Sequence, residues 1–439
     1  IQTRLASATD LPDIINMRSS DPALYGASGV IIPLENMINE KITPNAVKWF
    51  AKDPIFKNLH FSLDGHMYKI SGYRGKPELE GEPYSMAIRG DWLDNLGLKM
   101  PTTTEEFYNV LLNFKEKDAN RNGNLSDEIP FSLTYDQLGV LGTSFGLEIY
   151  TSQFYGLENG KITFAQLTEN FKQFMMYMNK LYKEGLLDSE FATINDDQLK
   201  AKDARNIIGA RGSMWGSQAI EAENSLKANN VLNARYEQML PLTGPQGKQG
   251  FILTFGLLDG KMSISKDCKN PETAMNFLDY CILSEEATML HNAGINGTSY
   301  TMSSDGKVVF NDFILKNPDG LSPFEALRSI GAYGTLPFIM NAEARKGLNS
   351  ATPKIGEFAD KMKPFIKDRI EFSVATADEV NESSVLERDI STYVNEMTLK
   401  FIIGNADIQK DWDSYVSQLN SMEVDKLLKI KQAQYDRLK

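Results

Sequence analysis

Histidine and cysteine are scarce in this chain of 439 residues, which has three of the former and two of the latter. His60, His66 and His291 lie far apart, and none sits in a nucleophile or metal-ligand motif, so we expect surface or packed histidines. Cys268 and Cys281 show neither Cys-x-x-Cys nor Cys/His ligand spacing. This argues against zinc binding and against a catalytic cysteine, but leaves the cellular compartment open.

Long apolar runs and a basic charge balance are also missing. No segment approaches the about 18 to 20 apolar residues that span a bilayer as a helix. Residues 1–6 do not read as a signal peptide, so we expect either a cytosolic protein or one whose export segment has been removed. The 58 acidic and 46 basic side chains give a formal charge of −12. This charge repels nucleic acid and anionic membranes, so we expect no nucleic-acid partner.

Aromatic residues, in contrast, are plentiful. The chain has 23 Phe, 17 Tyr and 4 Trp, together 10% of its residues. Many rings and few histidines suit a binding protein better than a general acid–base enzyme. Paired catalytic carboxylates of the glycoside hydrolase kind stay open, because 58 acids always allow some pair to meet in space.

Helical and strand patterns alternate along the chain, and the expected helices are longer than the expected strands. This mixture, without regular hairpins, predicts an α/β architecture with substantial helical decoration. Strands are predicted at the end of 10–15, at 67–70 and at 84–88, and helices at 101–117, 164–184, 270–293 and from about 385 onward.

No flexible linker separates the predicted elements, as is typical of hinge-bending proteins whose two lobes exchange the chain several times. We expect residues 1–135 to lie mostly in an N-terminal lobe that includes the loop 118–128. Residues 136–270 are expected mostly in a helix-rich C-terminal lobe, with 271–439 shared between lobes and hinge.

The loop 118–128 carries the strongest chemical motif. Side-chain oxygens at its positions 1, 3 and 5 follow calcium-ligand spacing, and Gly123 allows a tight turn. The twelfth position is Ile129 instead of a bidentate Glu, so the loop is EF-hand-like and not an EF-hand. Asp127 and Glu128, just before this position, must therefore complete the coordination of the ion. The alternative is an ordinary solvated turn. We expect one structural Ca²⁺ held by Asp118, Asn120, Asn122, Asn124, Asp127 and Glu128.

Candidate ligand-binding residues are rings and arginines in or beside loops. Trp215 and Tyr333 each lie among small residues, which leaves room for a ligand beside the ring. A flat ring suits the C–H face of a sugar, and an arginine suits an acidic group. The alternatives are a tryptophan packed on the core and arginines in surface salt bridges. The full candidate set is Trp215, Tyr333, Tyr68, Tyr73, Arg74, Arg89 and Arg211.

Four segments together resemble a known family. They are 5–15, 89–107 with its Arg-Gly-Asp-Trp and Pro-Thr-Thr-Thr-Glu-Glu-Phe sequences, 118–130, and 412–415. The chain is similar to the extracellular solute-binding proteins of ABC importers, within the large subgroup that includes alginate- and fructo-oligosaccharide-binding members.

The resemblance implies a two-lobed, periplasmic-binding-protein-like fold that closes on its ligand at a hinge, with a structural calcium loop. It implies rings at positions matching Trp215 and the Tyr333 loop, an oligosaccharide ligand, an ABC permease as partner, a monomeric state and no covalent chemistry. It places the protein outside the cytoplasm, lipid-anchored or periplasmic. A secreted polysaccharide lyase or glycoside hydrolase, and a receptor for peptides or other polar metabolites, are the alternatives.

Two departures from the family pattern stand out. Family members usually carry the Asp-Glu pair of the calcium loop one residue earlier, so an insertion near 125–126 leaves the last ligands open. They also carry a lipoprotein signal, an anchoring cysteine, and a first strand and helix ahead of the segment that starts here at Leu5. We therefore expect this chain to be incomplete at its N-terminus.

Overall fold

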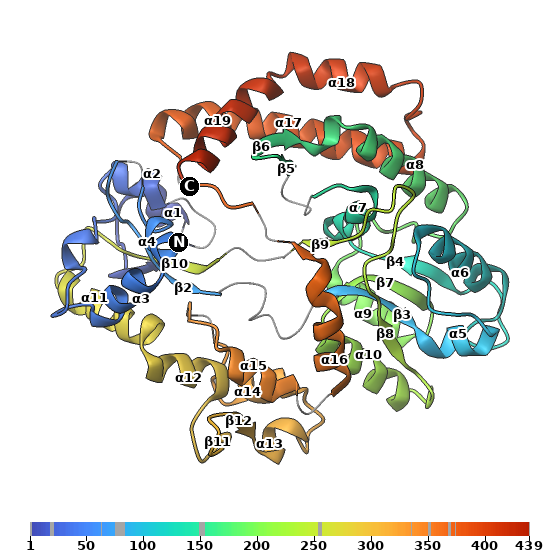
Figure 1. Ribbon diagram of the computed structural model, residues 1–439, viewed down its shortest axis with the longest axis horizontal. Helices are drawn as coiled ribbons and strands as arrows, with labels where there is room; N and C mark the ends of the chain where they lie inside the picture. The colour runs from blue at the N-terminus through green and yellow to red at the C-terminus, as the bar shows by residue number, and fades with distance from the viewer. Residues whose placement is uncertain are drawn as a thin grey trace.

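The computed structural model describes residues 2–17, 22–62, 64–74, 84–148, 154–252, 257–334, 336–349, 353–367, 370–373 and 375–438. Its helices and sheets form two lobes, and elements of both lobes alternate along the chain (Figure 1). Within the described parts, no helix is both long and apolar enough to span a membrane.

The first lobe is built on a three-stranded antiparallel sheet in the order β1 (Ile14–Asn16), β10 (Leu258–Ile264), β2 (Ile70–Tyr73). Its core joins the early helices to helix α11, with Phe56, Leu278 and Ile282 among its fully buried side chains. The helices of this lobe are α1 (Gln2–Ser7), α2 (Pro22–Ala27), α3 (Pro44–Lys52), α4 (Pro54–Asn58), α11 (Pro271–Leu283) and α12 (Glu285–Ala293).

An extension follows α12 and has a small core of its own, which Ala293 of α12 joins. It lies at the bottom of Figure 1, next to the first lobe. The extension consists of the antiparallel pair β11 (Tyr300–Met302) and β12 (Val308–Phe310) with α13 (Asp312–Leu315), α14 (Pro323–Ser329) and α15 (Ala342–Asn349).

The second lobe is built on a four-stranded mixed sheet in the order β4 (Ile129–Ser132), β7 (Ile208–Met214), β3 (Ser85–Arg89), β8 (Tyr236–Gln238). Strand β7 runs parallel to β4 and antiparallel to β3, and all its residues are buried, as expected of an inner strand covered on both faces. Helices α5 (Gly90–Leu96), α6 (Thr104–Glu116), α9 (Asp196–Ala204) and α10 (Gly216–Ala228) flank this sheet.

A helical layer covers the second lobe, at the top of Figure 1. Helix α8 (Glu169–Lys183) buries Phe171, Phe174, Met175, Met178 and Leu181, a spacing of three and four residues that places them on one face. Helix α17 (Ala377–Ile403) packs against α8, and α19 (Val424–Asp436) packs on α17 and on the hairpin β5 (Tyr155–Glu158) and β6 (Lys161–Phe164). In α18 (Trp412–Ser421), the rings of Trp412 and Tyr415 contact Phe171 of α8.

Short elements complete the two lobes and the region between them. Strand β13 (Ile366–Lys367) pairs in parallel with β9 (Phe251–Ile252). The Arg74 N–H donates a hydrogen bond to the Leu257 carbonyl at 2.9 Å. The remaining elements are α7 (Gly139–Gly142), α16 (Pro353–Met362) and the 3₁₀ turns Glu35–Met37, Tyr135–Gln137, Thr143–Phe145, Ala165–Leu167 and Lys363–Phe365.

The structure corrects two sequence predictions on organisation. Residues 84–135, including the loop 118–128, lie in the second lobe and not in the first, because β3 pairs with β7 and β8. The helix predicted over 270–293 is two helices. It breaks at Ser284, whose hydroxyl accepts the Ala287 N–H at 3.0 Å and so caps the start of α12.

Candidate ligand cleft and calcium loop

A cavity of about 450 Å³ lies between the two lobes and is called the central cleft below. Both lobes supply its walls, and the extension of the first lobe contributes one side. The first lobe and its extension supply Asn16, Arg74, Asp259, Gly260, Phe324, Glu325, Arg328, Tyr333, Gly334, Leu336, Pro337, Phe338, Met340 and Arg345, and the second lobe supplies Lys200, Trp215, Ser217, Gln218 and Glu221.

Trp215 stands on the second-lobe wall where β7 ends and α10 begins. Its backbone N–H donates to Gln218 Oε1 at 2.9 Å, a capping contact that fixes the start of the helix and with it the position of the ring. The ring centroid lies 5.0 Å from that of Tyr84 with a tilt of 37°, and both side chains are half-buried. The two rings form an aromatic platform whose tryptophan faces the cleft.

Tyr333 stands on the opposite wall, in the extension. Its φ of +50° is a left-handed conformation uncommon for a non-glycine residue, and its N–H donates to the His291 carbonyl at 2.9 Å. Its ring meets Phe324 at 5.3 Å and Phe338 at 5.5 Å, both edge to face. Phe338 in turn stacks on His291 at 5.4 Å. These contacts hold a cluster of rings at the cleft.

The segment 336–340 is fixed by strand β2. Tyr73 N–H donates to the Phe338 carbonyl at 3.2 Å, and Met340 N–H donates to the Tyr73 carbonyl at 2.9 Å. The approach requires glycine at position 72, because a Cβ there would lie 2.2 Å from the Phe338 carbonyl oxygen. The sheet of the first lobe therefore positions the aromatic wall directly.

The polar part of the first-lobe wall is an ion pair. Arg74 Nη2 lies 2.7 Å from Asp259 Oδ1, and the other carboxylate oxygen accepts the Phe338 N–H at 3.2 Å. Arg74 thus lines the cleft as the sequence predicted, with its charge already balanced by Asp259.

The two other predicted tyrosines lie elsewhere. Tyr68 is 4% exposed in the first-lobe core and donates to Asp64 Oδ2 at 2.9 Å; burial, followed by this bond, raises its pKa to about 12. Tyr73 donates to Asp53 Oδ2 at 2.8 Å and packs against Phe56 at 5.0 Å. Neither lines the central cleft, because both side chains are committed to the packing of the first lobe.

Two of the predicted arginines are buried in the second lobe. Arg89 is fully buried and makes bonds of 2.8 and 2.6 Å to Asp91 and one of 2.6 Å to Asn206. It does not line the central cleft, so its prediction as a ligand residue is corrected to a structural role. Arg211 forms an ion pair with Asp203 and lines a separate cavity of about 230 Å³, the side cavity, which shares Lys200 with the central cleft.

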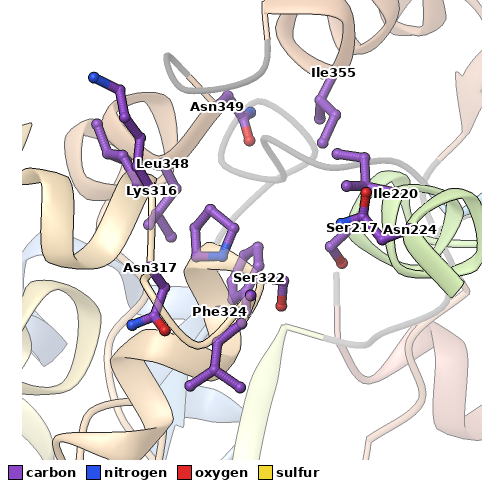
Figure 2. Close-up of a pocket in the computed structure, with 14 residues that line it drawn as sticks. Ser217, Ile220, Asn224, Lys316, Asn317, Ser322, Phe324, Leu348, Asn349 and Ile355 are labelled. Carbon is purple, nitrogen blue, oxygen red and sulfur yellow. The ribbon is translucent and has the colours of Figure 1, made fainter. Parts of the chain in front are cut away.

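An end cavity of about 230 Å³ adjoins the central cleft, since Ser217 and Phe324 line both. Figure 2 shows Ser217, Ile220 and Asn224 of α10 on one side, facing Lys316, Asn317 and Phe324 of the extension. The two adjoining cavities together are called the groove below. A ligand of several linked units can fill both cavities, whereas a compact ligand fills only one.

The residues that sequence reasoning missed come from segments far from Trp215 in the chain. No local pattern sets Lys200, Phe324 or Arg328 apart from other helical surface residues. Tyr84 carried a signal that went unused: it is the first residue of the strand predicted at 84–88, and the end of a strand, where a loop begins, is a common place for a binding residue.

The loop 118–128 turns its oxygens onto its own backbone. Asp118 Oδ1 accepts the Asn122 N–H and Oδ2 accepts the Gly123 N–H, both at 2.9 Å. Asn120 Oδ1 also accepts the Asn122 N–H at 2.9 Å, and Asn122 Nδ2 donates to Asp127 Oδ2 at 2.7 Å. Gly123 has a φ of +85°, as a tight cation-binding turn requires.

Glu128 provides the test of whether this loop suits a cation. Its Oε1 accepts the Ala119 N–H at 3.1 Å, but its Oε2 is buried without a hydrogen-bond partner among the described residues. Burial, and then the charge of Asp127, raise the pKa of Glu128. A cation would satisfy both features. No three His, Cys, Asp or Glu side chains gather as a metal-holding group within the described ranges, so an ion here also needs amide and carbonyl oxygens.

Residues 1–288 match the model of the family described as bacterial extracellular solute-binding protein. The chain belongs to this family. Similar members include the fructooligosaccharide ABC transporter substrate-binding protein FusA of Streptococcus pneumoniae, 27% identical over 98% of this chain and 81% of FusA. Lipoprotein LipO of Bacillus subtilis is 32% identical over 62% of this chain and 54% of LipO, and the polygalacturonan/rhamnogalacturonan-binding protein YtcQ of the same organism is 26% identical over 62% and 53%.

Solved structures confirm the two-lobed α/β fold of this solute-binding protein. The alginate-binding protein AlgQ2, solved without calcium ion, superimposes with a TM-score of 0.81 at 24% identity over 99% of this chain and 88% of AlgQ2. FusA in complex with kestose gives 0.79 at 24% identity over 99% and 89%. The resemblance expected from the sequence motifs is thereby confirmed, and the family is one of proteins that act outside the cytoplasm.

Proposed function

We propose that this solute-binding protein captures an oligosaccharide outside the cell and delivers it to the permease of an ABC transporter, without covalent chemistry. The observation that carries the proposal is the placement of rings on both walls of the central cleft. Trp215 lies on the second lobe and Tyr333 and Phe338 on the side of the first. Flat rings on facing walls suit the C–H faces of sugars, and the polar groups between them suit hydroxyls.

Capture follows from the two-lobed architecture. A ligand that touches Trp215 and Tyr333 together gains its full contact area only when the lobes approach each other. It therefore binds the closed state better and shifts the population toward it. The groove formed with the end cavity gives room for several sugar units.

The named relatives support a glycan ligand, since FusA and YtcQ are described by the oligosaccharide or polysaccharide they bind. FusA is described as an ABC transporter substrate-binding protein, and we propose that the partner here is likewise an ABC permease. We also propose that the receptor acts as a monomer on the outer face of the membrane, lipid-anchored or free in a periplasm. The alternatives are a polysaccharide-degrading enzyme and a receptor for peptides.

We further propose that the loop 118–128 binds one structural Ca²⁺, with Asp118, Asn120, Asn122, the Asn124 carbonyl, Asp127 and Glu128 as ligands. The partnerless Oε2 of Glu128 supports this assignment. So does the fold neighbour described as a FusA EF-hand mutant. When bound, the ion supplies charge that holds the carboxylates together. This chain's residues then tie the end of α6 to the start of β4, and Asn120 adds a bond of 3.1 Å to the Asn206 carbonyl.

A thermal-shift panel of oligosaccharides and peptides tests the ligand class. A ligand at about 100 times its Kd adds about 2.7 kcal/mol to the free energy of unfolding, so a cognate glycan raises the melting temperature visibly. Stabilisation by peptides alone contradicts the glycan assignment.

The enzyme alternative needs a separate assay. The protein is incubated with the stabilising glycan, and reducing ends and unsaturated products are measured over time. We expect the glycan to be recovered unchanged, and catalytic turnover would refute the receptor function.

A further inference from the structure

We infer that the captured oligosaccharide is anionic and that Lys200 and Arg328 recognise its charged groups from the two lobes. This inference rests on the proposed function of the central cleft and assigns the chemical class of its ligand. The ionised groups that line the cleft, and the partners each one has, support this ligand class.

Among the described residues, seven ionised side chains line the cleft. The cationic ones are Arg74, Lys200, Arg328 and Arg345, and the anionic ones are Glu221, Asp259 and Glu325.

Two of the carboxylates are fully engaged within the first lobe and its extension. Asp259 binds the Arg74 guanidinium and the Phe338 N–H. Glu325 Oε2 accepts both the N–H and the hydroxyl of Ser322, each at 3.0 Å, and so caps the first turn of α14. These acids are therefore occupied by contacts of the fold.

Lys200 and Arg328 differ from the other five. Both are exposed, and within the described parts of the chain neither has a hydrogen-bond or ion-pair partner. Lys200 lies on α9 of the second lobe, and Arg328 lies in the last turn of α14 in the extension of the first lobe. Four cations and three acids give the cleft lining a net charge of +1, and Lys200 and Arg328 are its two cations without ion-pair partners among the described residues, one on each side of the gap that closure would narrow.

Closure of the lobes brings these two cations into a less hydrated space. Like charges disfavour that approach, and a neutral glycan does not relieve the repulsion. A ligand with carboxylate or sulfate groups pairs with both cations and turns the repulsion into attraction. The protein as a whole carries a formal charge of −12, which disfavours anions at long range, so selection must come from these local groups.

The side cavity next to Lys200 limits where the charged group of the ligand can bind. Arg211 lines this cavity and pairs with Asp203. Asp196 and Glu221 line it as well, and Glu221 also lines the central cleft. These acids disfavour an anion inside the side cavity, so the anionic group of the ligand belongs in the central cleft.

Titration calorimetry with matched ligands tests the inference. Tri-galacturonate is compared with its full methyl ester, which keeps the sugar backbone and removes the charge, and with a sulfated and a neutral galactotriose. We expect a charged form, carboxylated or sulfated, to bind at least about tenfold more tightly than its neutral counterpart, with an advantage that falls as salt is raised. Which charged form binds identifies carboxylate or sulfate as the source of the anion.

Variants assign the effect to the two residues. Lys200→Gln and Arg328→Gln should each weaken binding of the charged glycan by about five- to tenfold, and binding of the neutral one by clearly less, because only the charged form loses an ion pair. Lys200→Arg should retain most of the affinity. Lys410→Gln, at an exposed cation remote from the cleft and paired with Asp407, is the control and should change neither. Circular dichroism verifies that each variant is folded.

The outcomes separate the two proposals. Equal or tighter binding of the neutral glycans overturns the anionic inference and leaves oligosaccharide capture intact. Preference for the charged form that survives both glutamine substitutions overturns the roles of Lys200 and Arg328. Failure of every glycan, charged or neutral, overturns the proposed function and the inference with it.

Discussion

Arg74 and Asp259 form an ion pair at the edge of the first-lobe sheet, with Nη2 2.7 Å from Oδ1. Asp259 also accepts the Phe338 N–H, so one carboxylate joins Arg74 to the aromatic wall of the cleft. The side chains are only 24% and 12% exposed, which limits screening of the pair by solvent. The geometry of the ligand site therefore depends on a contact inside the first lobe.

Asp259→Ala should weaken both folding and ligand binding. The substitution leaves the Arg74 guanidinium and the Phe338 N–H without this acceptor, a loss of about 1 to 3 kcal/mol in the free energy of unfolding. Asp259→Asn, which keeps an acceptor oxygen, should lose less. Urea titration measures the difference, and an unfolding free energy equal to that of the wild type in both variants would contradict the role given to this carboxylate.

Trp215→Ala should weaken oligosaccharide binding by about 1 to 3 kcal/mol, because the ring loses its contact with the sugar. Trp215→Phe keeps a smaller ring and should lose less. Trp49→Phe is the matched control: Trp49 packs on Tyr73 and donates to the Leu283 carbonyl in the first lobe, so its loss should lower stability and spare affinity. Calorimetry measures the affinity of each variant, and an affinity of Trp215→Ala equal to that of the wild type would show that this ring serves packing and not ligand binding.

Removal of calcium should lower the melting temperature. Calcium at a free concentration of about 100 times its Kd adds about 2.7 kcal/mol to the free energy of unfolding, and EGTA removes this contribution. Asp118→Asn and Glu128→Gln should abolish the EGTA effect, whereas Asp305→Asn, in the turn between β11 and β12 of the extension, should preserve it. An EGTA-insensitive melting curve, with no metal found by elemental analysis, would refute the calcium assignment.

The three histidines should titrate differently. His60 lies between the Phe56 carbonyl, 2.7 Å from Nδ1, and the Ser71 N–H, 3.1 Å from Nε2. Burial, and then the charge of Lys69, lower the pKa of His60 to about 3 from its usual 6.5. Burial likewise lowers the pKa of His291, while a hydrogen bond to Glu35 raises that of exposed His66.

These pKa shifts determine how the folding stability changes with pH. Unfolded His60 takes up a proton near pH 6.5, but folded His60 does so only near pH 3. Its contribution to the free energy of unfolding is therefore full above pH 6.5 and declines as the pH falls from 6.5 toward 3. The contribution of His66 is full below 6.5 and is lost as the pH rises through its raised folded pKa. NMR titration of the ring C–H signals measures each pKa, and a His60 signal that moves near pH 6.5 would show the burial to be wrong.

Local signals in the sequence predicted much of the secondary structure. The helix after residue 103 was found from its hydroxyls and acids, and Thr103 indeed accepts the Glu106 N–H at 3.1 Å. The break at Ser284 was missed because apolar residues continue on both sides of it. The lobe membership of 84–135 was also missed, since it depends on pairing with β7, more than seventy residues later.

A residue of the candidate site could be predicted only where the residues next to it in the sequence indicated space for a ligand. Trp215 and Tyr333 stand among small residues that leave space, and both line the cleft. Tyr73 shares the same strand end as Arg74, yet it packs into the lobe while Arg74 faces the cleft, a difference that the alternation of a strand decides. Lys200 and Arg328 could not be predicted as ligand residues, because only the packing of the two lobes places them in one cleft.

A crystal structure of the protein with the glycan that stabilises it most tests the account directly. The account predicts an intact oligosaccharide in the central cleft, with a sugar ring stacked on Trp215, contacts to the Tyr333 side and lobes closer together than in the free protein. A glycan bound on another surface, or one cleaved within the cleft, would contradict it.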